Sequence, residues 1–192
     1  VSPLVGFGIG FLVMLAFYWI FQKATPGKLN RRFRVVQWFS ASFLAISHGS
    51  NDAQKSMGII AMALVAAGFM DADNMHVPTW VKICCALAMA IGTSTGGWRI
   101  IKTMGSKMIK LEPPSGCAAE ISSSIVILSA SHIGLPVSTT HVISGSIMGV
   151  GTTRGLNAVR WDVASKMLSA WFLTIPSTAV VGYVVCRAIS LG

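Results

Sequence analysis

Apolar residues along this chain gather in long runs that short polar segments separate. Three runs, residues 4–21, 79–97 and 162–189, are each long enough for one helix across a bilayer. Two longer segments, residues 35–70 and 116–150, are apolar except for a polar stretch near the middle. Because the runs are continuous and do not alternate with a period of two, they predict transmembrane helices rather than the strands of an outer-membrane barrel.

The first interruption is residues 48–55, which have the sequence HGSNDAQK. Helical pieces on either side, residues 35–47 and 56–70, would be about 20 and 22 Å long. Neither piece would cross a hydrocarbon core of about 30 Å on its own. The pattern therefore predicts two half-helices that meet at a break deep in the membrane, either within one crossing or at the tip of a re-entrant hairpin.

The second interruption is residues 134–141, which have the sequence GLPVSTTH. The helical pieces beside it, residues 117–132 and 141–150, are again too short to span a bilayer separately. Two segments of similar length with polar, helix-breaking centres are typical of the broken helices of secondary transporters. The expected fold is an all-α integral membrane protein, a transmembrane helix bundle with two broken or re-entrant helices.

Composition supports a membrane location. Hydrophobic residues make up 53% of the 192 residues and charged residues 11%, whereas a soluble domain is about 25% charged. The net charge of +9 would suit nucleic-acid binding, but the basic residues lie in short segments between the apolar runs, which is the positive-inside pattern. We therefore expect a lipid bilayer, and no nucleic acid, as a partner.

Charge also predicts the orientation. Residues 23–34 carry five basic residues and no acid, which places this expected loop in the cytoplasm. Residues 71–78 carry two aspartates and no lysine or arginine, which places that loop outside. Residues 100–111 interleave apolar and basic positions and predict a short amphipathic interfacial helix, which Pro113 and Pro114 would end.

Small residues form two pairs that would let neighbouring helices approach closely, and the cysteines lack the spacing of metal ligands. Gly6 with Gly10, and Gly145 with Gly149, are small-xxx-small pairs that let another helix approach closely. The four cysteines lie in or beside apolar runs and lack a CxxC spacing, so we expect them to pack as small apolar residues. No cofactor is expected apart from a coupling ion.

Asp52 is one of two acidic residues inside an apolar segment. An unpaired ionised carboxylate at that depth costs about 2.5 kcal/mol or more, so it must pair, bind a cation or hold a proton. Together with Asn51 and Gln54 it offers oxygen ligands for Na⁺, or a carboxylate for proton transfer. The alternative is a structural pair with Lys55, one helical turn away.

Glu120 is the other acid of this kind. It is a candidate for the coupling ion or proton, or it lies near the interface and pairs with Lys110. His48 and His141 flank the two interruptions, where each would shuttle protons, donate to an anion, or sit as a satisfied buried imidazole.

The hydroxyl run Ser138, Thr139 and Thr140 follows Pro136, at the expected start of a half-helix. Such a terminus presents free backbone N–H groups and a positive dipole end, and adjacent hydroxyls add donors, so an anion site is favoured. The alternative is a hydroxyl that only caps the helix. Residues 92–96, GTSTG, match a hydrolase motif, but that motif needs a strand–turn–helix elbow and here ends a helix.

At these residues the chain resembles the PiT family of inorganic phosphate transporters. The resemblance covers nearly the whole chain and rests on four stretches, residues 47–55, 92–99, 118–120 and 134–141. It implies half of an inverted-repeat transporter that moves phosphate together with Na⁺ or H⁺. The chain resembles the C-terminal repeat at 35–192, preceded by a transmembrane helix at 1–22 and the basic loop 23–34.

The resemblance also implies which residues form the site. Phosphate would be bound by four residues, Asn51, Ser138, Thr139 and Thr140. Asp52 and Asn51 would serve the coupling ion, as Na⁺ ligands in a sodium-coupled protein. The residues themselves, apart from the resemblance, add Glu120 as a further candidate for the coupling ion or proton. They also offer four accessory candidates, His48, Gln54, Lys55 and His141.

We therefore expect a multi-pass transporter of the cell membrane, in a bacterial or archaeal inner membrane, and not an enzyme. Its partners would be inorganic phosphate and the N-terminal repeat of the same transporter, and a homodimer remains open. The alternatives are a transporter of another oxyanion such as sulfate, an intramembrane hydrolase using Ser94 or Ser138 with a histidine, and a non-transporting scaffold subunit.

Overall fold

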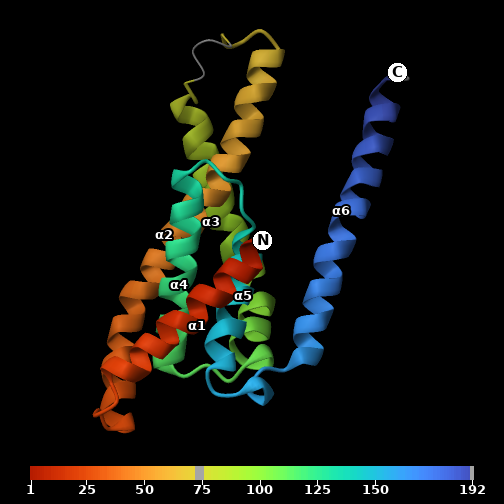
Figure 1. Ribbon diagram of the computed structural model, residues 1–192. Coiled ribbons are helices and arrows are strands. Elements are labelled where there is room, and N and C mark those ends of the chain that lie inside the picture. Colours follow the sequence, from red (N-terminus) through yellow and green to blue (C-terminus); the bar gives the residue numbers. More distant parts are fainter. Residues whose placement is uncertain (72–75, 191–192) are drawn as a thin grey trace. The chain divides into compact units, whose positions relative to one another are not determined.

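The computed structural model describes residues 1–71 and 76–190, and this part of the chain is helical without strands (Figure 1). Six α-helices follow one another: α1 (Ser2–Ile20), α2 (Pro26–Ala66), α3 (Thr79–Lys102), α4 (Pro113–His132), α5 (Thr139–Thr152) and α6 (Trp161–Ser190). A short π-helix, η2 (Thr103–Met108), continues α3, and a 3₁₀ turn, η3 (Leu156–Ala158), follows α5. The expected all-α fold is confirmed for these residues.

The chain divides into two compact units, Val1–Val159 and Arg160–Gly192. In the first unit α1 packs along α5, α2 runs beside α4, and α4 packs against α5 (Figure 1). A small apolar core joins α4 to α5 through Val126, Ile127 and Val142. In its described part the second unit is the single helix α6, which contains Pro176.

The two glycine pairs meet at the contact between α1 and α5. A Cβ atom added at Gly10 would lie 2.5 Å from the carbonyl oxygen of Ser146, and one added at Gly6 would lie 2.6 Å from that of Val142. Cβ atoms added at Gly145 and Gly149 would come even closer to α1, at the backbone carbonyl oxygens of Pro3 and Phe7. The predicted close approach is therefore confirmed, and only residues without a Cβ permit it.

The predicted break near residues 134–141 is confirmed between α4 and α5. Gly134 has a φ of +75°, a left-handed conformation that glycine adopts without strain. Its N–H donates to the carbonyl of Ser131 and the N–H of Leu135 to that of Ala130, which is the hydrogen-bond pattern of a Schellman motif. Pro136 follows and keeps the chain from resuming the helix at once.

The predicted break at residues 48–55 is wrong, because α2 runs through them without interruption. None of the eight residues is proline, and a single glycine inside a helix costs only about 1 kcal/mol relative to alanine. Their polar side chains find partners on α2 itself and on the α4–α5 segment, so the backbone has no need to open. At about 1.5 Å per residue, this helix of 41 residues is about 60 Å long.

Two smaller expectations also need correction. Residues 26–34 are the first turns of α2 and not part of a loop. Pro113 and Pro114 begin α4 rather than end a helix, since proline lacks an N–H that the first turn would leave unbonded anyway. The expected interfacial helix at 100–111 is replaced by the end of α3, the π-helix and an extended segment.

Two described helices, α1 and α6, are long and apolar enough to cross a membrane by length and composition. The other long helices carry polar residues in their middle portions. For α2 these are the residues that assemble the site described next.

Because α2 is continuous, its ends should lie on opposite sides of the membrane. Cysteines placed one at a time at Lys28 and Asp71, in a cysteine-free background, should react with a membrane-impermeant maleimide from the inside and the outside respectively. Residues 72–75, which include the second acid of the expected outer loop, lie outside the described residues. Labelling of both positions from one side would contradict a single crossing by α2.

Candidate functional site

The carboxylate of Asp52 is the centre of a polar cluster on α2. Its Oδ1 accepts a hydrogen bond from Nζ of Lys55 at 2.8 Å. Its Oδ2 lies 2.9 Å from Nε2 of His48, one turn earlier on the same helix. These three residues are spaced four and three apart, so they share one face of α2 and stabilise it locally. The structural pair of Asp52 with Lys55 is therefore present.

A second element reaches the same carboxylate from the start of α5. Oγ1 of Thr139 donates to Oδ2 of Asp52 at 3.2 Å, and the Thr139 side chain is buried. Nζ of Lys55 also donates to the carbonyl oxygen of Val137, at 2.6 Å. The turn between α4 and α5 is thus tied to the middle of α2 through residues more than 80 positions apart. The structure brings the two predicted motifs together.

A pocket of about 360 Å³ opens at this junction. It is lined by seven residues, Asp52, Lys55, Pro136, Val137, Ser138, Thr139 and Thr140. Its wall contains one carboxylate, one ammonium group and three hydroxyls. The first turn of α5 begins there and contains no acidic residue of its own, although the carboxylate of Asp52 reaches it through Thr139. Ammonium, hydroxyl and backbone N–H donors are groups that can bind an oxyanion.

Ser138 is the N-cap of α5 as well as a wall of the pocket. Its hydroxyl oxygen accepts from the backbone N–H of His141 at a long 3.5 Å. The capping interpretation is therefore correct for Ser138 but describes a weak bond. Thr140 lines the pocket and is exposed. Of the three hydroxyls, Thr140 is the freest to meet a ligand.

Asn51 precedes Asp52 on α2 and is 3% exposed. Its Nδ2 donates to Oγ of Ser131 on α4 at 2.6 Å. Its Oδ1 has no hydrogen-bond partner among the described residues, although it is buried. A buried amide oxygen without a partner is costly, and a hard cation such as Na⁺ would satisfy it.

Glu120 does not belong to this cluster. It accepts hydrogen bonds from Oγ of Ser40 at 2.5 Å and from Nε2 of Gln37 at 3.4 Å, both on α2. It lines a separate pocket of about 300 Å³ with Arg34, Gln37 and other residues of α2. The expected pairing of Glu120 with Lys110 is therefore wrong, because Glu120 faces α2 across the α2–α4 contact.

The other predicted site residues lie at the margin. Gln54 is exposed and is not part of the pocket wall. His48 also lines a larger pocket of about 770 Å³ between α2 and α3, next to Thr93 and Ser94. His141 is partly exposed on the first turn of α5. None of the three lines the pocket at Asp52, although His48 contacts the carboxylate directly.

The hydrolase alternative finds no support in the described residues. Ser94 lies inside α3 and donates to the carbonyl of Ile91, so no strand–turn–helix elbow presents it. Ser138 caps α5. Neither hydroxyl donates to a histidine in the described hydrogen bonds, which a nucleophilic serine would require.

Sequence reasoning missed three polar partners, Gln37, Ser40 and Ser131. Gln37 and Ser40 are three residues apart in an otherwise apolar part of α2, a spacing that puts them on one helix face. That signal was present in the sequence. Ser131 carried no such signal, because its role depends on how α4 packs against α2.

Comparison with known proteins identifies the chain. Residues 1–182 match the phosphate transporter family. The chain is 46% identical to a probable low-affinity inorganic phosphate transporter of Rhizobium meliloti (strain 1021) and 45% identical to one of Bacillus subtilis (strain 168). In both cases the match covers 94% of this chain and 54% of the relative. The chain thus spans about half the length of the curated relatives it matches.

A solved structure, "The sodium-dependent phosphate transporter", is similar with a TM-score of 0.70 and 27% identity, covering 86% of this chain and 42% of that one. The family and these relatives are transporters and not enzymes. The expected resemblance is confirmed. By its sequence over residues 1–182 and by its fold, the chain belongs to the phosphate transporter family.

Proposed function

We propose that the chain is the C-terminal repeat of an inorganic phosphate symporter in the cell membrane, and that phosphate binds between the start of α5 and the Asp52 face of α2. The observation that carries the proposal is the pocket whose wall joins Lys55 to the hydroxyls of Ser138, Thr139 and Thr140. Lys55 supplies positive charge, and the first turn of α5 supplies backbone N–H groups.

The coupling ion would bind at Asp52 and Asn51. Asp52 alone would repel a phosphate dianion, so a cation or proton at its carboxylate has to accompany the substrate. The Oδ1 atom of Asn51 and the carboxylate of Asp52 are oxygen ligands of the kind that Na⁺ takes. The sodium-dependent neighbour favours Na⁺ over H⁺. Glu120, in its own pocket between α2 and α4, would provide a second cation or proton site.

Residues 35–192 would form the repeat proper, with residues 1–22 as the helix before it and the basic segment 23–34 between them. The N-terminal repeat of the same transporter would complete the substrate site from the other side, as in an inverted-repeat transporter. The whole protein would cross a bacterial or archaeal inner membrane several times, alone or as a homodimer.

Removing the pocket hydroxyls one at a time tests the phosphate site. Thr140→Val should weaken phosphate binding roughly tenfold or more, because a hydrogen bond to a charged group is worth about 1.5–3 kcal/mol. Thr139→Val should weaken it similarly and also remove a donor from Asp52. Binding is measured on the whole protein by calorimetry, alongside thermal stability without phosphate.

Thr152→Val is the matched control, since it deletes a hydroxyl at the far end of α5 that bonds only to its own helix. It should leave phosphate affinity unchanged. If Thr139→Val and Thr140→Val also kept normal affinity and only lost about 0.5–2 kcal/mol of stability, the hydroxyls would serve as helix caps and phosphate would bind elsewhere.

A further inference from the structure

Another pocket lies away from the Asp52 site, where α1 ends and α2 begins. It has a volume of about 680 Å³, within the range of small-molecule sites. Its walls come from the end of α1, the first three turns of α2 and the face of α4 near Cys117 and Ile121. Most of the lining is apolar, yet three basic residues, Lys23, Lys28 and Arg32, also line it.

The apolar part of this groove is a cluster of three phenylalanines. The ring centroid of Phe33 lies 5.2 Å from that of Phe17 and 5.1 Å from that of Phe21. Phe17 and Phe21 contact each other edge to face at 6.0 Å. Phe33 is 6% exposed, so the cluster is packed against the unit and forms a fixed apolar wall. Such a wall accepts a hydrocarbon chain.

The charged part of the groove has no acidic residue among the described residues that line it. Lys28 and Arg32 lie one helical turn apart on α2, and like charges at this spacing repel each other. The unbalanced positive charge in the groove therefore favours a negatively charged ligand. A phosphate diester bound by both side chains would remove the repulsion and gain charge-assisted hydrogen bonds.

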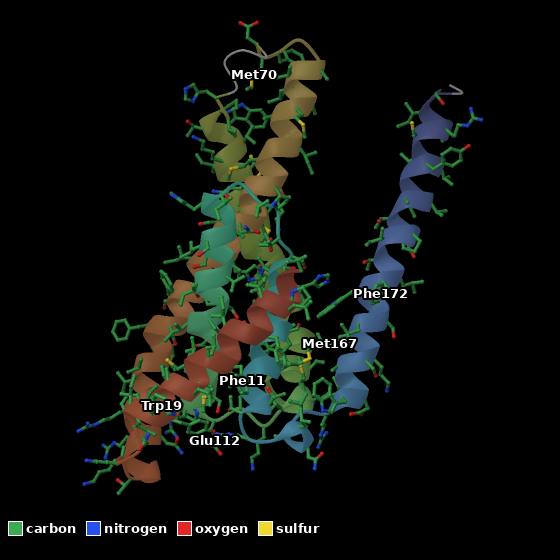
Figure 2. The ribbon with its side chains drawn as sticks, in the orientation of Figure 1. Phe11, Trp19, Met70, Glu112, Met167 and Phe172 are labelled. Atoms are coloured by element: carbon green, nitrogen blue, oxygen red, sulfur yellow. The ribbon has the colours of Figure 1, made fainter. Side chains whose placement is uncertain are left out.

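The surroundings are those of a membrane surface. Residues 23–34 carry five basic residues and no acid, the pattern of a cytoplasmic face. Trp19, labelled at the same end of α1 in Figure 2, is 77% exposed, and tryptophan is enriched at the level of lipid headgroups. The cytoplasmic leaflet carries anionic lipid.

We propose that this groove is a binding site for an anionic phospholipid. One acyl chain lies against Phe17, Phe21 and Phe33, and the headgroup phosphate lies between Lys28 and Arg32, with Lys23 close to it. The site is distinct from the phosphate pocket, with which it shares no residue.

Native mass spectrometry of the purified chain tests the proposal. The chain is exchanged into micelles that contain equal amounts of phosphatidylglycerol and phosphatidylcholine, and bound lipid is counted. Phosphatidylglycerol should be retained in preference. Lys28→Gln and Arg32→Gln should each lower its binding roughly fivefold, as expected for one basic residue at an anionic surface. Val36→Trp should also lower it, because Val36 lines the groove and a larger side chain would fill it.

Arg31→Gln is the matched control. Arg31 lies on α2 between the two tested positions and is exposed, but it does not line the groove. Its variant should bind phosphatidylglycerol as the unmodified chain does. Equal losses in Arg31→Gln and Arg32→Gln would show only a general surface charge and overturn the site. Equal retention of both lipids, or displacement of phosphatidylglycerol by inorganic phosphate, would also overturn it.

Discussion

Replacing Asp52 with asparagine should abolish ion-coupled phosphate uptake while the protein still inserts and folds. The amide keeps the shape of the carboxylate and still accepts the hydrogen bond from Thr139. It loses the negative charge that attracts a cation and pairs with Lys55. A hydrogen bond or ligand contact to a charged group is worth about 1.5–3 kcal/mol, so cation affinity should fall at least about tenfold. Uptake of labelled phosphate is measured in vesicles against Na⁺ concentration and pH, on the whole protein.

Asp162→Asn provides the control for this experiment, because Asp162 lies in the first turn of α6, outside the unit that holds the site. Phosphate uptake by the Asp162→Asn variant should keep the normal dependence on ion concentration. If Asp52→Asn also kept that dependence, the carboxylate would act as a structural partner of Lys55 and His48, and the coupling ion would have to bind elsewhere.

Replacing Gly149 with alanine should destabilise the contact between α1 and α5 by about 1–3 kcal/mol or more. The added Cβ would collide with the carbonyl group of Phe7 and lie 3.0 Å from the backbone nitrogen of Phe11. Phe11 is labelled on α1 in Figure 2. Backbone atoms cannot change rotamer, so α1 itself has to move away from α5. The measurement is the unfolding midpoint of the purified chain in detergent.

Replacing Gly8 with alanine should not lower the stability of the chain. A Cβ at Gly8 meets nothing within 4 Å, and alanine is favoured over glycine in a helix by up to about 1 kcal/mol. This variant should therefore be as stable as the unmodified chain or more so. Loss of stability in Gly8→Ala equal to that in Gly149→Ala would contradict a specific contact through the glycine faces.

The two interruptions in the apolar pattern show what the sequence can predict. At residues 134–141 the signals are local, because a glycine that readily adopts a left-handed conformation is followed two residues later by a proline, and together they favour the end of a helix. At residues 48–55 the signals were only polar side chains. Whether these break a helix depends on partners about 80 positions away, such as Ser131 and Val137. Periodicity carries no information on such partners, so the continuous course of α2 could not be foreseen.

Part of the candidate site could also be predicted from the sequence, and part could not. Asp52 and the hydroxyls of residues 138–140 were expected to act together because both motifs resembled one family, and the structure places Thr139 on Asp52. Glu120 was assigned to the same coupling function, but it packs against Gln37 and Ser40 in a different pocket. Its position follows from the register of α4 against α2, which tertiary packing decides and composition does not.

The hydroxyl of Thr139 carries a single proton, and in this structure it points to Asp52. Under the proposed function, phosphate would compete for that proton and leave the carboxylate with one donor fewer. Asp52 would then hold a cation more tightly than before. Thermodynamic linkage requires the reverse effect to be equally large, so the factor by which the cation strengthens phosphate binding must equal the factor by which phosphate strengthens cation binding. One shared proton would thus give both ligands the same coupling free energy.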